Sequence, residues 1–163
     1  MEYWDAYDEN MNLIEGMTLT RGETVPDGVF HLVCDIFLEH EDGTILIMQR
    51  DPAKEYGGLW EATAGGSALK GESPLECAQR ELYEETGIRG RDFREYKRGQ
   101  SLGPHCFYTE FTALTDCDKT SVRMQENETV AFRWVTKEEL KELKVAGQLT
   151  ERSCGCVSEI LHE

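Results

Sequence analysis

The sequence has no long hydrophobic run and few basic residues, and each absence excludes a class of function. No apolar stretch approaches the roughly 20 residues that a membrane-spanning helix needs. Lysine and arginine number 17 against 32 acidic residues, which leaves a formal net charge of −15, and no basic cluster stands out. A surface of this sign repels DNA and anionic membranes. We therefore expect neither a nucleic acid nor a membrane as the partner.

The signs of a secreted protein are also missing. The segment Met1 to Asp5 has neither a basic start nor an apolar stretch, so no signal peptide is expected. The six cysteines are irregularly spaced in a chain of 163 residues, which favours reduced thiols over a disulfide framework. Cys154 and Cys156 could form a redox or metal pair, but no second pair at ligand spacing completes it. The predicted location is the cytoplasm.

Length and composition indicate one domain. The 163 residues are 39% hydrophobic and 30% charged, which suits one globular core and is too short for two. We read 1–163 as a single domain that opens with a polar, extended segment over 1–28. Strands are predicted over 29–38, 44–48, 105–113 and 130–135, with helices over 73–87, from 136 and over 150–161. This interleaving predicts an α/β fold with helices on both faces of a sheet.

The helix predicted over 73–87 has typical capping residues at both ends. Ser73 is expected at the N-cap and Pro74 at the first helical position, and Glu76 completes a capping box. Gly87 is expected to end the helix. The apolar face that we expect to pack on the sheet consists of Leu75, Ala78, Leu82 and Thr86.

Three glutamates lie beside that apolar face. At about 100° per residue, Glu81, Glu84 and Glu85 fall within an arc of about 100° and can converge on one point. Like charges at this spacing destabilise a bare helix, and a bound divalent cation would reverse the cost. Carboxylate oxygens suit Mg²⁺ or Mn²⁺. Taken alone, however, most acidic helix faces are simply solvated.

The residues around these glutamates form a longer pattern. Gly66, five residues, Glu72, seven residues and then the run from Arg80 to Ile88 match every fixed position of G-x5-E-x7-R-E-U-x-E-E-x-G-U, where U is a bulky aliphatic residue. By chance such a match arises on the order of once in 10⁹ starting positions. The pattern is the Nudix box, and the chain therefore resembles the Nudix hydrolases. An ion pair between Glu72 and Arg80 is expected to lock the loop onto the helix.

The resemblance implies a Nudix-type α/β/α sandwich around a mixed β-sheet, with the box at 66–88 as a loop–helix–loop. It implies a Mg²⁺- or Mn²⁺-dependent hydrolase that cleaves a diphosphate bond in a small substrate, such as a nucleoside diphosphate derivative. The residues that it suggests as metal ligands are Glu81, Glu84, Glu85 and the carbonyl of Gly65.

Further site residues are expected outside the box helix. Family members often add a glutamate from another loop, for which Glu128 is the first candidate and Glu126 the second. The general base would be Glu81 or Glu128, and the sequence leaves both open. Arg50 and Lys54 are candidates for contacts with substrate phosphates, and Gly66 would let the substrate approach the backbone closely.

The resemblance extends to a branch of the family. The segments from Trp4 to Asn10, Arg21 to His31 and Gln49 to Trp60 look like the branch that includes isopentenyl-diphosphate isomerases. Those isomerases carry a catalytic cysteine and a metal-binding histidine where this chain has Gly65 and Ser67, which favours hydrolysis.

Two alternatives to hydrolysis stay open, namely an isomerase-like enzyme and a module that senses a nucleotide without turning it over. His31 matches a ligand histidine of the isomerases, but a lone histidine on a strand is more often a core residue. A homodimer, built in part by the N-terminal segment, is a further hypothesis.

Overall fold

A computed structural model describes residues 1–162, arranged around one seven-stranded sheet and a separate two-stranded hairpin. The strands are β1 (Tyr3–Tyr7), β2 (Leu13–Thr20), β3 (His31–His40), β4 (Ile45–Arg50), β5 (Trp60–Glu61), β6 (Ala64–Ser67), β7 (Arg91–Ser101), β8 (Cys106–Thr115) and β9 (Thr129–Val135). The helices are α1 (Pro74–Thr86), α2 (Lys137–Val145) and α3 (Glu151–Ile160), with a short 3₁₀ helix η1 (Lys119–Ser121). None of the helices in the described part is long and apolar enough to span a membrane.

The large sheet is mixed. Its main order is β5-β4-β3-β8-β7, while β6 pairs with β3 and β9 pairs with β4. The central pair, β3 and β8, runs parallel, and the other strand pairs of this sheet within the described residues run antiparallel. The mixed sheet that the sequence predicts is confirmed.

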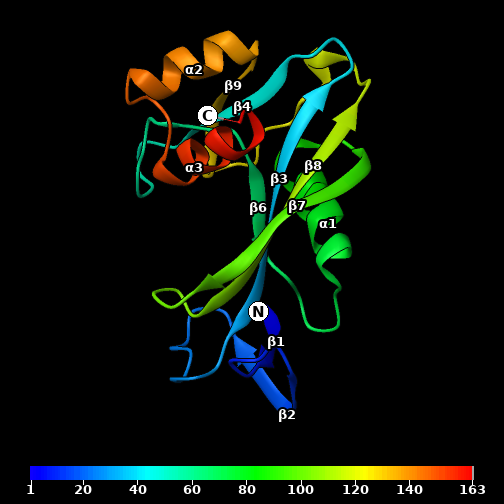
Figure 1. The fold of residues 1–163 in the computed structure, drawn as a ribbon, viewed down its shortest axis with the longest axis vertical. Helices are drawn as coiled ribbons and strands as arrows, with labels where there is room; N and C mark the ends of the chain where they lie inside the picture. Colours follow the sequence, from blue (N-terminus) through cyan, green and yellow to red (C-terminus); the bar gives the residue numbers. More distant parts are fainter. Residues whose placement is uncertain (163) are drawn as a thin grey trace.

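Helices cover both faces of this sheet. Successive side chains on a strand point to opposite sides, so neighbouring residues of β3 show which helix lies on each face. Ile36 packs in the cluster that includes Leu82 of α1. Its neighbour Phe37 packs in a second cluster, with Leu140 of α2 and Val157 of α3. Figure 1 shows the same division, with α1 on one side of β3 and the other two helices opposite. The three layers of the predicted sandwich are therefore present.

The ends of α1 are built as predicted. Ser73 caps the helix, its side chain accepts a hydrogen bond from the amide of Glu76, and the reciprocal bond completes the capping box. Gly87 adopts a left-handed conformation with φ of 72° and ends the helix. These caps fix where the helix begins and therefore which of its residues face the sheet.

One residue, Leu75, was wrongly assigned to the apolar face of α1. Leu75 is 42% exposed, and the buried residues of α1 are instead Cys77, Ala78, Leu82 and Thr86. The helix packs on β6 through Cys77, whose Sγ lies 3.6 Å from the carbonyl oxygen of Gly66. Residue 75 lies about 200° around the helix from residue 77 and therefore turns towards solvent.

The N-terminal segment forms a hairpin with a small core of its own. β1 and β2 pair antiparallel, and Trp4, Ala6, Leu19 and Val29 are buried together. An isolated bridge between Tyr7 and Phe30 ties the hairpin to the start of β3. The expected extended pieces are present, and they bring Glu2 and Trp4 to the edge of the cavity described below.

The strand β7 was not predicted from the sequence. Its residues, RDFREYKRGQS, are mostly charged or polar and show no regular alternation. It lies at the edge of the sheet and pairs only with β8 among the described strands. An edge strand buries little of its surface, so charged side chains on it remain solvated. Its composition can therefore resemble that of a loop.

Candidate active site

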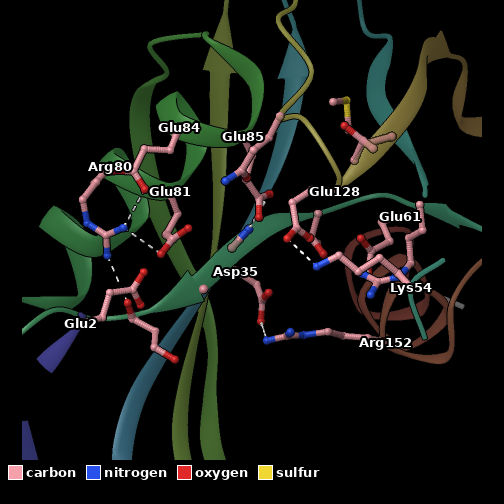
Figure 2. A pocket seen from close by; sticks show the side chains of 18 of the residues that line it. Glu2, Asp35, Lys54, Glu61, Arg80, Glu81, Glu84, Glu85, Glu128 and Arg152 are labelled. Carbon is pink, nitrogen blue, oxygen red and sulfur yellow. Dashed lines mark hydrogen bonds and ion pairs between the residues drawn. The ribbon is translucent and has the colours of Figure 1, made fainter. Parts of the chain in front are cut away.

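A cavity of about 340 Å³ lies where β6, α1, the loop before β9 and the start of α3 meet. Figure 2 shows the charged side chains that point into it. Seven carboxylates line it: Glu2, Asp35, Glu61, Glu81, Glu84, Glu85 and Glu128. Five cationic side chains accompany them: Arg21, Arg50, Lys54, Arg80 and Arg152. The cavity therefore has an excess of negative charge before any ligand binds.

Arg80 holds the loop after β6 against α1. Its Nε and Nη2 donate to the two carboxylate oxygens of Glu72 at 2.7 and 2.9 Å, and Nη2 also donates to the carbonyl of Ser67 at 3.0 Å. Glu72 accepts a further bond from the amide of Leu69 at 2.8 Å. The predicted pair of Glu72 and Arg80 is confirmed, in a bidentate geometry that restrains the loop.

The same guanidinium reaches two of the box glutamates. Nη1 of Arg80 donates to Glu81 at 2.8 Å and to Glu84 at 3.0 Å. The side chain of Glu81 is 14% exposed, whereas that of Glu84 is 51% exposed. Burial raises the pKa of Glu81, and the positive charge of Arg80 opposes that rise.

Glu85 turns the other way. Its Oε2 accepts a hydrogen bond from the amide of Gly65 at 3.2 Å. Burial raises the pKa of Glu85 to about 8, and the neighbouring charge of Glu81 adds to the rise. The ionised form of a buried carboxylate beside another carboxylate is unfavourable unless a cation lies nearby.

The three box glutamates line one cavity, where each already has a hydrogen-bond partner in the protein. Arg80 draws Glu81 and Glu84 to one side, and Glu85 bonds to β6. Within residues 1–162, no three acidic, histidine or cysteine side chains form a ready-made metal site. The donor set nevertheless fits a hard divalent cation, because it offers only oxygen ligands and places partly buried carboxylates of like charge side by side.

The two glycines at the start of the box permit close packing. A Cβ at Gly66 would lie 2.5 Å from Oε1 of Glu81, and a Cβ at Gly65 would lie 2.2 Å from the carbonyl oxygen of Cys34. Any side chain at residue 66 would therefore displace the carboxylate of Glu81. Both glycines line the cavity.

The opposite wall carries the residues predicted to bind phosphates. Lys54 forms a close ion pair with Glu128. Arg50 pairs with Glu61 at 2.9 Å and donates from Nε to the carbonyl of Glu55 at 2.7 Å. The structure brings Arg50, Lys54 and Glu128 to the cavity as the sequence suggested, whereas the second candidate, Glu126, does not line it.

Sequence reasoning missed the pair of Asp35 and Arg152. Asp35 is only 4% exposed, and its carboxylate forms a close ion pair with Arg152 from α3. Burial raises the pKa of Asp35 to about 6 although Arg152 opposes it. A lone aspartate within the apolar run VCDIF was a usable signal for a special site. Nothing in the local sequence distinguishes Arg152.

The positions that differ from the isomerases lie in the cavity wall. Gly65 and Ser67 line it, and no cysteine among the described residues does. The nearby thiols, Cys34 and Cys77, are completely buried. All six cysteines are free thiols.

His31 does not line this cavity, although its neighbour Trp4 does. It is 7% exposed, its Nδ1 lies 3.1 Å from the carbonyl oxygen of His105, and its ring stacks on Trp4 at 4.5 Å. It is a core residue, as its setting on a strand suggested.

Comparisons with known proteins agree with this architecture. A family model described as NUDIX domain matches residues 29–152. An uncharacterized Nudix hydrolase from Listeria monocytogenes is 36% identical over 154 residues, which cover 91% of this chain and 88% of the relative.

Solved structures share the fold at low identity. A crystal structure of a Deinococcus radiodurans protein aligns with a TM-score of 0.74 at 20% identity, over 96% of this chain and 97% of the other. The NUDIX domain of NrtR from Shewanella oneidensis, crystallised with ADP ribose, aligns with a TM-score of 0.62 at 17% identity, over 82% and 87% of the two chains.

Proposed function

The chain belongs to the Nudix family and is a Nudix hydrolase, and from that premise we propose that it uses a divalent cation, Mg²⁺ or Mn²⁺, to cleave a diphosphate linkage in a small substrate. The observation that carries the proposal is the cavity in which the box glutamates face Arg50 and Lys54. A nucleoside diphosphate derivative is the preferred class of substrate. A cytoplasmic location and a homodimer stay predictions from the sequence.

Glu81, Glu84 and Glu85 would hold the cation, with the carbonyl of Gly65 as a further candidate. When bound, the cation would neutralise diphosphate charge and lower the pKa of a water molecule. Arg80 has a separate role: it keeps the loop and the helix in register through Glu72.

The basic side chains on the opposite wall would orient the substrate. Arg50 and Lys54 are each held by a carboxylate, Glu61 and Glu128, so their charges are already positioned at the cavity edge. A diphosphate that enters the cavity offers them a second anionic partner. Holding the reacting groups in place in this way removes much of the entropic cost of the reaction.

The bond changes are those of a simple hydrolysis. The oxygen of water forms a bond to one phosphorus, the bond between that phosphorus and the bridging oxygen breaks, and the leaving phosphate keeps the electron pair. A carboxylate accepts the proton of the water. Glu81 on α1 and Glu128 in the loop before β9 stand on different walls of the cavity, and both remain candidates for this base.

The alternatives are less well supported. An isomerase-like reaction would lack its cysteine, because Gly65 and Ser67 occupy the relevant wall and no cysteine of the described chain lines the cavity. A module that only senses a nucleotide would have no need for the complete set of box carboxylates. Neither alternative has an observation of its own in its favour.

The test is product release from a panel of diphosphate compounds, including ADP-ribose, a nucleoside diphosphate and isopentenyl diphosphate, with and without Mg²⁺. We expect Mg²⁺-dependent turnover that falls at least 100-fold in Glu84→Gln, whose side chain is half exposed and therefore tolerates the change. Conversion of isopentenyl diphosphate to its isomer, or tight binding without turnover of any compound, would contradict hydrolysis.

A further inference from the structure

The N-terminal hairpin of β1 and β2 lies outside the residues that the family model matches. That model begins at residue 29, whereas the hairpin occupies residues 3–20. Glu2, Trp4 and Arg21, which lie in the hairpin or directly beside it, nevertheless line the cavity that holds the box glutamates. They form a part of the cavity wall that the family model does not include.

The alternation of side chains along the two strands gives the hairpin two different faces. Trp4 pairs with Leu19 across the hairpin, and both are buried in its small core. Asp5 pairs with Thr18, and this pair points to the opposite face, because successive residues of a strand alternate. Residues directly opposite each other on two strands lie on the same side, so Asp5 and Thr18 can contact one neighbour together.

That neighbour is the loop between β6 and α1. The amide of Gly71 donates to Oδ2 of Asp5 at 2.7 Å, and Nζ of Lys70 donates to the hydroxyl oxygen of Thr18 at 2.5 Å. The amide of Lys70 also donates to the carbonyl oxygen of Tyr3 at 2.8 Å. Figure 1 shows this loop reaching from the sheet towards the hairpin. Three hydrogen bonds therefore fasten the tip of the loop to the hairpin.

The same loop leads directly to the ion pair that orders the box. Glu72, the next residue of the loop, holds Arg80 through two hydrogen bonds. Arg80 in turn contacts Glu81 and Glu84. Asp5 itself does not line the cavity, so its effect on the box glutamates passes through the loop. A hydrogen bond from a backbone amide to a carboxylate is among the stronger kinds, which suits it to hold a loop in place.

We propose that the N-terminal hairpin is a positioning element of the candidate cation site and that Asp5 is its positioning residue. Asp5 fixes the loop, the loop places Glu72, and Glu72 keeps Arg80 from pairing more closely with Glu81. When Asp5 is lost, Arg80 competes with the cation for the carboxylate of Glu81, and the cation binds more weakly. This inference rests on the proposed function, because the proposed use of a divalent cation gives the box carboxylates their role.

Two substitutions at residue 5 separate the hydrogen bond from the charge. Asp5→Ala removes the acceptor, whereas Asp5→Asn removes the negative charge and keeps an acceptor oxygen for the amide of Gly71. Asp8→Ala is the matched control, because Asp8 lies in the turn of the same hairpin and its carboxylate accepts hydrogen bonds from Asn10 and Asn12 within that turn. Urea unfolding establishes that each variant is folded.

The first readout is the binding of Mn²⁺ alone, without substrate, measured by electron paramagnetic resonance. We expect Asp5→Ala to raise the Kd for Mn²⁺ at least about fivefold, while Asp5→Asn and Asp8→Ala stay within about twofold of the wild type. The second readout is hydrogen exchange of the amides of residues 69–72, all of which donate hydrogen bonds in the structure. In Asp5→Ala these amides should exchange at least about tenfold faster.

Several results would overturn the positioning role. An unchanged Kd or unchanged exchange in Asp5→Ala would show that the hydrogen bond to Gly71 does not hold the loop. An equal rise of Kd in Asp5→Asn would assign the effect to the lost charge. An equal rise in Asp8→Ala would assign it to general loosening of the hairpin.

Turnover by the wild-type protein with Mg²⁺ is scored separately, so that the two proposals can fail independently. Turnover of a diphosphate compound together with an unchanged Kd for Mn²⁺ in Asp5→Ala overturns the positioning role and leaves hydrolysis standing. A raised Kd in that variant, without turnover of any compound by the wild type, supports the positioning role and overturns hydrolysis. Absence of Mn²⁺ binding to the wild type at millimolar concentration overturns the positioning role.

Discussion

Gly66 has no side chain, and this leaves room for the carboxylate of Glu81 beside it. We expect Gly66→Ala to lower turnover at least tenfold, because its Cβ would stand 2.5 Å from Oε1 of Glu81 and push that carboxylate aside. The free energy of unfolding should fall by no more than about 1 kcal/mol, since the displaced group is the end of a flexible side chain. Steady-state kinetics and urea unfolding measure the two effects.

The control for this change is Gly103→Ala. A Cβ there meets nothing within 4 Å, and the residue has no positive φ. Both turnover and unfolding should match the wild type. A Gly66→Ala protein with full activity would show that the position of Glu81 in the ligand-free structure has no bearing on catalysis.

The sequence predicted which carboxylates reach the site, but it did not predict their orientation. The spacing of the box identifies Glu81, Glu84 and Glu85 because helix geometry alone puts them on one side. Their actual directions depend on Arg80 and on the amide of Gly65, which are tertiary contacts. Asp35 reaches the cavity only because β3 lies beside β6, a pairing that no local pattern encodes.

At the scale of elements, one ion pair joins the loop after β6 to α1. We expect Glu72→Gln to lower the free energy of unfolding by about 1.5 to 3 kcal/mol, because Arg80 loses its charged bidentate partner in a mostly buried setting. Turnover should fall as well, since Arg80 is then free to pair more closely with Glu81. Urea denaturation and steady-state kinetics give the two values.

The pair of Glu95 and Arg98 provides a comparison on the surface. These side chains also form two short hydrogen bonds, but they are 36% and 55% exposed. Glu95→Gln should therefore change the free energy of unfolding by less than about 0.5 kcal/mol. Equal effects of the two substitutions would mean that the contact between Glu72 and Arg80 does not anchor the loop.

Elements with strong local signals were predicted well, and elements stabilised by position alone were not. α1 carries its own caps, so both of its ends could be read from Ser73, Glu76 and Gly87. β7 carries no such signal, because it is a charged edge strand whose register is set by β8. Leu75 was misassigned since the contact of Cys77 with β6, and not the helical period, sets the rotation of α1.

For the whole molecule, a cation that binds among partly buried carboxylates should stabilise the fold. We expect saturating Mg²⁺, at about 100 times its Kd, to add about 2.7 kcal/mol to the free energy of unfolding. For a chain of 163 residues this corresponds to a rise in Tm of about 5 to 10 °C. Calorimetry with and without Mg²⁺ measures it, and a chelator should reverse both the shift and the turnover.

Glu84→Gln provides the matched control, since it removes one candidate ligand and leaves the surface charge otherwise unaltered. Its Tm should respond less to Mg²⁺ than that of the wild type. If Mg²⁺ left the Tm of the wild type unchanged while still supporting turnover, the cation would arrive with the substrate and would have no site of its own on the protein.

The parallel pairing of β3 with β8 determines how this chain must fold. His31 lies beside Cys106, 75 positions further along the chain, and the whole box lies between them. The centre of the sheet can therefore close only after a long loop has been ordered, which slows the search for the native state. During synthesis β3 leaves the ribosome long before β8. Its apolar residues therefore stay unpaired for that interval, and we expect the nascent chain to be most prone to aggregation then.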